Sequence, residues 1–132
     1  MAHGDTEVVR RLYAGWEAGD FAVEMDSYDP DVELVIDYGP DQISARGIDE
    51  MRDVWREQLT LWDSWSTGPI QTLVEDGDRV VVGHSLRGRS KRGISVHMEE
   101  AGCAFILRDG RVTWIFATDR LSKALQAVGL LE

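Results

Sequence analysis

Apolar side chains recur at helical spacing through the first half of the chain and again at its end. A first helix is predicted from its cap Asp5 to Gly19, with an apolar stripe of Val9, Leu12, Tyr13 and Trp16. A second helix, capped by Asp20 and ended by Pro30, is predicted to turn inward Phe21, Met25 and Tyr28. A third is predicted over residues 48–65, ended by Gly68-Pro69, with a stripe of Met51, Trp55, Gln58, Trp62 and Trp65.

Most of the remaining apolar positions alternate with polar ones, as is typical of strands. One strand is predicted from Val32 to Tyr38, and four more over residues 70–75, 79–89, 94–107 and 111–118. A final helix is predicted to bury Leu121, Ala124, Leu125 and Val128. Helices followed by a long antiparallel meander predict an α+β fold, and the length of 132 residues fits a single domain over residues 1–132.

Charge and composition exclude several classes of partner. The net charge of −10 argues against nucleic acid, because phosphate backbones are bound by basic faces. The apolar runs are too short for a membrane span, and no signal-peptide pattern opens the chain. With a single cysteine, Cys103, no internal disulfide can form, which agrees with a reducing compartment. A cytoplasmic location is therefore expected.

Four basic residues interrupt the acidic background near one predicted hairpin tip: Arg87, Arg89, Lys91 and Arg92. We interpret them as a solvated turn. A site for an anionic ligand or a membrane headgroup is the alternative interpretation.

The predicted hairpins place a histidine opposite a glutamate. If Ser90 to Gly93 closes one hairpin, His84 opposes Glu99 within an apolar sheet face. If Asp109-Gly110 closes the next, the same face also holds His97, Cys103, Phe105, Trp114 and Phe116. A carboxylate can orient a histidine as a general base near neutral pH, whereas an internal hydrogen bond without chemistry is the structural alternative.

Other polar residues are secondary candidates for the site. Asp37 ends a predicted strand, where its carboxylate could overlook a cavity mouth and take part in catalysis. Tyr13 could donate a hydrogen bond to a ligand oxygen. Trp16 and Trp55 are expected in the core and pocket lining. No metal site is predicted, because His84, His97 and Glu99 lack a fourth ligand, and no cofactor motif is present.

Short motifs along the whole chain resemble those of one family. They are Glu-Ala-Gly-Asp at 17–20, Asp-Pro-Asp-Val at 29–32, Gly-Asp-Arg-Val at 77–80 and Arg-Asp-Gly-Arg-Val at 108–112. Each is weak alone, but their order, together with the strand and helix over residues 108–130, resembles SnoaL-like domains of the nuclear-transport-factor-2-like superfamily. The resemblance implies a cone-shaped fold, a pocket on the concave sheet face and a homodimer through the outer face.

The resemblance does not name one activity, because the fold hosts unrelated ones. Individual branches of the superfamily can still be compared with this sequence. In the ketosteroid-isomerase branch, the oxyanion-stabilising tyrosine and second acid correspond here to Leu12 and Cys103, so that activity is not expected. Epoxide hydrolysis would need an Asp-Arg-Asp cluster for which no arginine is evident. The polyketide-cyclase branch tolerates more variation.

We therefore predict a pocket for a hydrophobic, partly polar small molecule. If the protein is an enzyme, we expect cofactor-free acid–base catalysis. The reaction would be an isomerisation, a cyclisation or an addition of water, as in hydratases and epoxide hydrolases. His84 would be the base and Glu99 its partner, while Asp37 or Tyr13 would contact the polar group of the substrate. The alternatives are a non-catalytic binding protein and a dimeric interaction module whose interior is filled.

Overall fold

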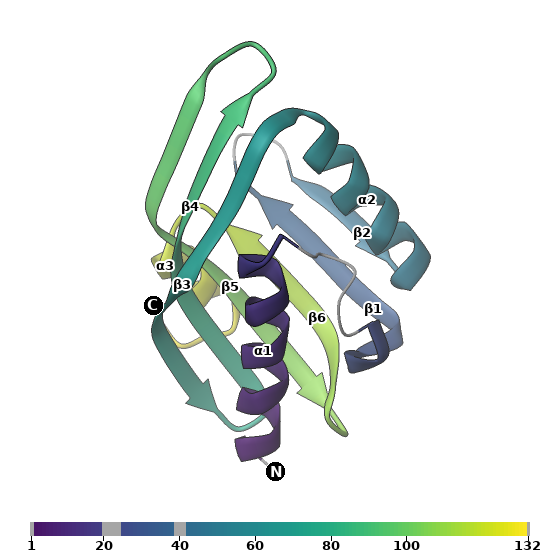
Figure 1. The fold of residues 1–132 in the computed structure, drawn as a ribbon. Helices are drawn as coiled ribbons and strands as arrows, with labels where there is room; N and C mark the ends of the chain where they lie inside the picture. Colours follow the sequence, from purple (N-terminus) through teal and green to yellow (C-terminus); the bar gives the residue numbers. More distant parts are fainter. Residues whose placement is uncertain (1, 20–24, 39–41, 132) are drawn as a thin grey trace.

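The computed structural model describes residues 2–19, 25–38 and 42–131. Within them lie three α-helices, one short 3-10 helix and six strands. In chain order these are α1 (Ala2–Glu17), η1 (Met25–Ser27), β1 (Tyr28–Asp37), β2 (Ile43–Arg46), α2 (Ile48–Thr60), β3 (Trp62–Asp76), β4 (Arg79–Ser90), β5 (Ser95–Arg108), β6 (Arg111–Thr118) and α3 (Leu121–Ala127). Figure 1 shows their arrangement, and the predicted α+β class is confirmed.

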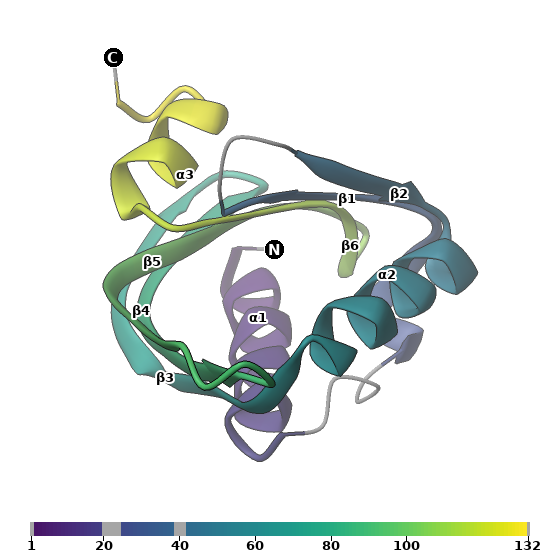
Figure 2. The same cartoon turned by 90° about the horizontal axis from the view of Figure 1, so that it is seen from above.

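The strands form one mixed sheet in the order β2-β1-β6-β5-β4-β3. All neighbours are antiparallel except β1 and β6, which run parallel. Seen from above, the sheet curves around α1, α2 covers the open side, and α3 lies outside (Figure 2). None of the helices in the described ranges combines the length and the apolar character needed to span a bilayer.

The first helix carries the predicted apolar stripe into the concave side of the sheet. Val9, Leu12 and Tyr13 are fully buried, and Trp16 is nearly so. Gly19 ends the helix as predicted: its φ of 84° is left-handed, and its N–H donates to the Trp16 carbonyl. The predicted cap is wrong, because the helix already begins at Ala2 and Asp5 lies in its first turn.

The second predicted helix is only partly described. Asp20 and Phe21 lie outside the described residues, and Met25 belongs to the short helix η1. Tyr28 is buried as predicted, but it opens β1 instead of sitting on a helix.

The third helix is five residues shorter than predicted, because α2 ends at Thr60 and the chain enters β3 at Trp62. Trp62 and Trp65 therefore lie on a strand. Gly68-Pro69 does not break an element but lies inside β3, beside a register irregularity between Thr67 and Ile70. A proline is tolerated there because β3 is an edge strand, where its missing N–H costs no ladder hydrogen bond.

A bulge in the β5–β6 hairpin changes which aromatic residues face inward. The two-residue turn is correct, since Arg108 pairs with Arg111 and both Asp109 and Gly110 have positive φ. The register then shifts between Ile106 and Leu107. Beyond this bulge the inward residues Cys103 and Phe105 oppose Ala117 and Ile115, where the simple register predicts Phe116 and Trp114.

A second bulge changes the β4–β5 pairing. Arg89 opposes Ser95 instead of Ile94, and Leu86 opposes Met98. The register shifts between Leu86 and His84, so that His84 opposes Ala101. The predicted opposition of His84 and Glu99 is therefore wrong.

The convex face is partly covered by α3. Gly83 and Gly102 pair in register beneath this helix, and a Cβ on Gly102 would lie 3.1 Å from the Leu121 Cα atom. Two small residues on neighbouring strands thus let the helix backbone approach the sheet closely.

Candidate functional site

Two adjoining chambers lie between the concave sheet face and the helices. The outer chamber has a volume of about 140 Å³ and is lined by Ile36, Tyr38, Trp55, Gln58, Leu59, Trp62, Trp65, Met98 and Ala117. The inner chamber is about 50 Å³ and is lined by Trp16, Leu34, Tyr38, Trp55, Trp65, Thr67, His84, Leu86, Cys103, Ile115 and Ala117. The four residues on both lists place the chambers side by side.

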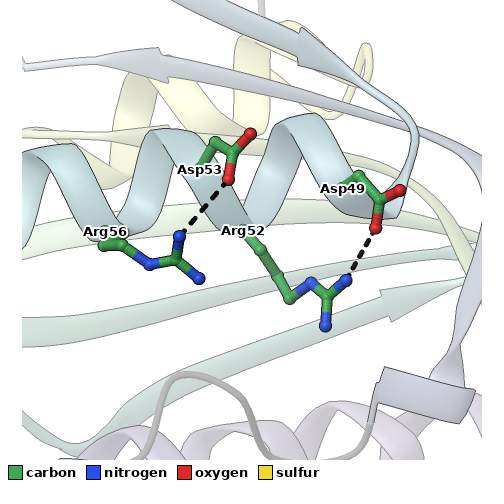
Figure 3. Close-up of polar contacts among 4 residues, drawn as sticks. All are labelled: Asp49, Arg52, Asp53 and Arg56. Carbon is green, nitrogen blue, oxygen red and sulfur yellow. Dashed lines mark hydrogen bonds and ion pairs between the residues drawn. The ribbon is translucent and has the colours of Figure 1, made fainter.

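The walls of the outer chamber are mainly apolar, and α2 and β3 supply three tryptophans to them. On α2, Trp55 faces the chamber, while the exposed face carries ion pairs of Arg52 with Asp49 and of Arg56 with Asp53 (Figure 3). The β3 rings of Trp62 and Trp65 lie 5.0 Å apart between centroids. This chamber suits an apolar ring.

His84 is one of three titratable residues that line the inner chamber, with Tyr38 and Cys103. Its side chain is 2% exposed, and Nδ1 lies 2.9 Å from the Tyr13 hydroxyl. Burial lowers the His84 pKa from 6.5 to about 4, so that the imidazole is neutral at physiological pH. Because Tyr13 occupies Nδ1, the nitrogen left for a ligand is Nε2, which can donate or accept a hydrogen bond according to the tautomer.

Tyr13 also contacts a second group of the inner chamber, the thiol of Cys103. The two side chains lie close enough for each to affect the pKa of the other. Burial raises the pKa of Tyr13 well above 10 and raises the pKa of the Cys103 thiol from 9 to about 12. Tyr13, Cys103 and His84 are therefore all neutral at pH 7, and none is an activated nucleophile.

Tyr38 is a polar residue that the sequence analysis did not single out. It lines both chambers, and burial raises the pKa of its hydroxyl, which stays protonated. Among the described residues its hydroxyl has no hydrogen-bond partner. Alternation along β1 is the signal that could have identified it, because Leu34 and Ile36 face the same side.

Three predicted site residues lie elsewhere. Glu99 and His97 are exposed, so neither lines a chamber with His84. Asp37 also lines neither chamber; it follows the inward-facing Ile36 on β1 and pairs with Thr118 of β6. In the described part of the chain, no three side chains of His, Cys, Asp or Glu gather as a metal site.

The predicted aromatic lining divides between the two faces of the sheet. Trp16 and Trp55 line the inner chamber, and Phe105 is buried beside them in the concave core. Trp114 and Phe116 instead stack on each other in the cluster beneath α3, with centroids 5.9 Å apart. The bulge in the β5–β6 hairpin is the cause, since it exchanges the two faces of β6.

Comparison with protein families gives a match over most of the chain: residues 9–115 match the family model of the SnoaL-like domain. A comparison with curated proteins returned no match. The family match begins at Val9 in the middle of α1 and runs to Ile115 in the middle of β6.

Solved structures agree in fold. The protein TerC, co-crystallised with polyporic acid, is 24% identical, with 86% of this chain and 89% of that chain covered and a TM-score of 0.74. A nuclear-transport-factor-2-like protein of unknown function from Burkholderia pseudomallei is 18% identical, with coverages of 96% and 98% and a TM-score of 0.77. A candidate polyketide cyclase from Xanthomonas campestris pv. campestris is 17% identical, with coverages of 97% and 98% and a TM-score of 0.76. Given the match over residues 9–115, this chain belongs to the SnoaL-like domain family.

Proposed function

We propose that this chain binds a small ring compound carrying one polar oxygen, with the ring in the outer chamber and the oxygen in the inner one. The observation that carries the proposal is the neutral, buried His84 at the inner end of an aromatic chamber. Nε2 of His84 and the hydroxyl of Tyr38, which has no partner among the described residues, are the groups that would hydrogen-bond this oxygen. TerC, a structural neighbour, was co-crystallised with polyporic acid, which supports a small organic molecule as the ligand here.

Chamber size restricts the ligand. A closed cavity of about 150 Å³ accepts a benzene molecule, and the outer chamber measures about 140 Å³. Sites for drug-sized ligands occupy roughly 300–1,000 Å³. A single six-membered ring therefore fits the chambers as they stand, whereas a larger ligand would require Trp62 or Trp65 to move.

Binding is tested with cyclohexanone and 4-methylphenol as probes, followed by tryptophan fluorescence and by chemical-shift changes of the His84 imidazole. Saturable binding that His84→Ala or Tyr38→Phe weakens by about tenfold would support the proposal, since each variant removes one hydrogen bond in a buried site. His97→Ala is the matched control, because His97 is exposed on the same sheet. Equal binding by all variants would contradict the proposal.

A second candidate function is cofactor-free acid–base catalysis on the same ligand. It is favoured by the placement of His84, whose ring Tyr13 holds at Nδ1 while Nε2 is left for the substrate. With its own proton on Nδ1 and donated to the Tyr13 hydroxyl oxygen, His84 would accept at Nε2 a proton from the carbon beside a carbonyl group. Tyr38 would donate a hydrogen bond to the developing oxyanion, and Tyr13 would act as a positioning residue. A pKa of about 4 makes His84 a weak base, so a modest acceleration of proton transfer is expected.

Deuterium exchange distinguishes catalysis from binding alone. Cyclohexanone in D₂O should lose its α-protons faster with the protein than in buffer, and His84→Ala should abolish the acceleration. If cyclohexanone binds but its exchange is not accelerated, the proposed binding function stands and catalysis on cyclohexanone is excluded.

We also propose that the convex face outside α3 forms a homodimer. Val35, Val74, Ile106 and Trp114 lie there, half-buried around the cluster that α3 covers. Such a partly apolar face is typical of surfaces that pair with a second copy.

A further inference from the structure

A cationic groove lies on the sheet end formed by β3, β4 and β5, near the tip of the β4–β5 hairpin that projects in Figure 1. Its volume is about 550 Å³, and it is open to solvent. The residues that line it are Ser64, Trp65, Ser66, Arg87, Gly88, Arg89, Ser95, Val96 and His97. We call it the arginine groove.

Strand register explains why these residues meet. Ser66 pairs with Arg87, and Arg87 pairs with His97, which makes one row across three strands. In the second row, Ser64 pairs with Arg89, and Arg89 pairs with Ser95. Arg87 and Arg89 are two residues apart on one strand, so both project from the same face. Each arginine thus stands between two side chains that donate hydrogen bonds.

The charge of the groove is not balanced within the described residues. Neither Arg87 nor Arg89 makes an ion pair there, although the chain has 24 acidic and 14 basic residues. Glu99 and Glu100 are exposed on β5 but do not line the groove. Lys91 and Arg92 follow in the loop at the tip and add positive charge. The two guanidinium groups repel each other, and an anion bound between them would relieve that repulsion.

We propose that the arginine groove binds a phosphate monoester, as a second site separate from the two chambers. The two guanidinium groups can each donate paired N–H groups to phosphate oxygens. Ser64, Ser66 and Ser95 supply hydroxyl donors around them. Donors from three strands surround a tetrahedral group with three terminal oxygens better than they surround a planar carboxylate. The phosphate can belong to a soluble metabolite or to a lipid headgroup, since the chemistry of recognition is the same.

Calorimetry in phosphate-free buffer tests the proposal with two probes: glycerol 3-phosphate, and phosphatidylcholine vesicles containing phosphatidic acid. Arg87→Gln/Arg89→Gln should weaken binding by roughly tenfold or more, because it removes both charged donors to the phosphate oxygens. The matched control is Arg108→Gln/Arg111→Gln, which removes an exposed arginine pair from the β5–β6 hairpin. Glycerol, which lacks the phosphate, should not bind.

The outcomes separate the sources of the phosphate. Saturable binding of glycerol 3-phosphate that depends on Arg87 and Arg89 supports a soluble ligand. Binding of the vesicles alone, with the same dependence, supports a lipid headgroup. Absence of binding to both probes, or an equal loss in the control pair, would overturn the proposal. Circular dichroism of each variant confirms that it is folded.

Discussion

The Tyr13 hydroxyl and the His84 imidazole lie 2.9 Å apart, although 71 positions separate them in the chain. The first comes from α1 and the second from β4, and both are buried. Their rings also meet edge to face, with centroids 5.1 Å apart. This contact joins the helix in the concavity to the sheet and fixes the imidazole at the end of the inner chamber.

Removing the Tyr13 hydroxyl should therefore destabilise the protein. Tyr13→Phe leaves Nδ1 of His84 buried without its partner, which costs about 1–3 kcal/mol of unfolding free energy. Denaturant unfolding measures this loss. Tyr38→Phe is the control, because the Tyr38 hydroxyl has no partner among the described residues, and its removal should change stability much less. Equal losses in both variants would contradict the role of the Tyr13 contact.

Stability should fall as the pH falls from about 6.5 to about 4, and His84 should contribute to this fall. The folded-state pKa of His84 is about 4 and its unperturbed value is 6.5, so the unfolded chain takes up a proton first. The neutral form favours folding above pH 6.5, and up to roughly 3 kcal/mol of this contribution is lost by pH 4. His84→Gln should flatten this part of the unfolding profile, whereas His97→Gln should not. An unchanged slope in His84→Gln would exclude His84 as its source.

The Cys103 thiol should be unreactive in the folded protein. It is 3% exposed, and burial raises its pKa to about 12, so almost no thiolate is present at pH 8. Ellman's reagent should modify it only after unfolding in guanidinium chloride. Rapid modification of the native protein would show that the inner chamber opens readily.

The width of the outer chamber should depend on Gly88. A Cβ there would lie 2.9 Å from Trp65 Cε3 and 3.0 Å from Trp62 Cε3, so Gly88→Ala forces the tryptophans to shift. The variant should bind 4-methylphenol more weakly and should change tryptophan emission. Ser66→Ala is the control, since Ser66 lines the arginine groove and neither chamber. Unchanged affinity in Gly88→Ala would mean that the ring binds elsewhere.

The proposed homodimer predicts a mass of twice that of the chain in light scattering. Val74→Lys places a charge on the half-buried convex face and should shift the protein to monomer. Gln71→Lys makes the same change in charge at an exposed position of β3 and should leave the dimer intact. A monomeric wild-type protein would contradict the homodimer.

Much of the fold could be predicted from the sequence, because the signals are local. The stripe of Val9, Leu12 and Tyr13 predicts the first helix and its buried face, and Asp109-Gly110 predicts a two-residue turn. The spacing of Trp62 and Trp65 continues that of the helix and predicts an end near Trp65, whereas α2 ends at Thr60. The sequence carries no strong stop signal between them and Thr60.

Only the tertiary structure decides on which face of the sheet each side chain of the long hairpins lies. One extra residue at each bulge exchanges the faces of everything beyond it, so Trp114 and Phe116 turn outward. A bulge depends on how strands curve around the core, and the sequence does not mark its position. The sequence by itself determined that His84 sits in an apolar strand; only the curvature of the sheet around α1 gave it Tyr13 as a partner instead of Glu99.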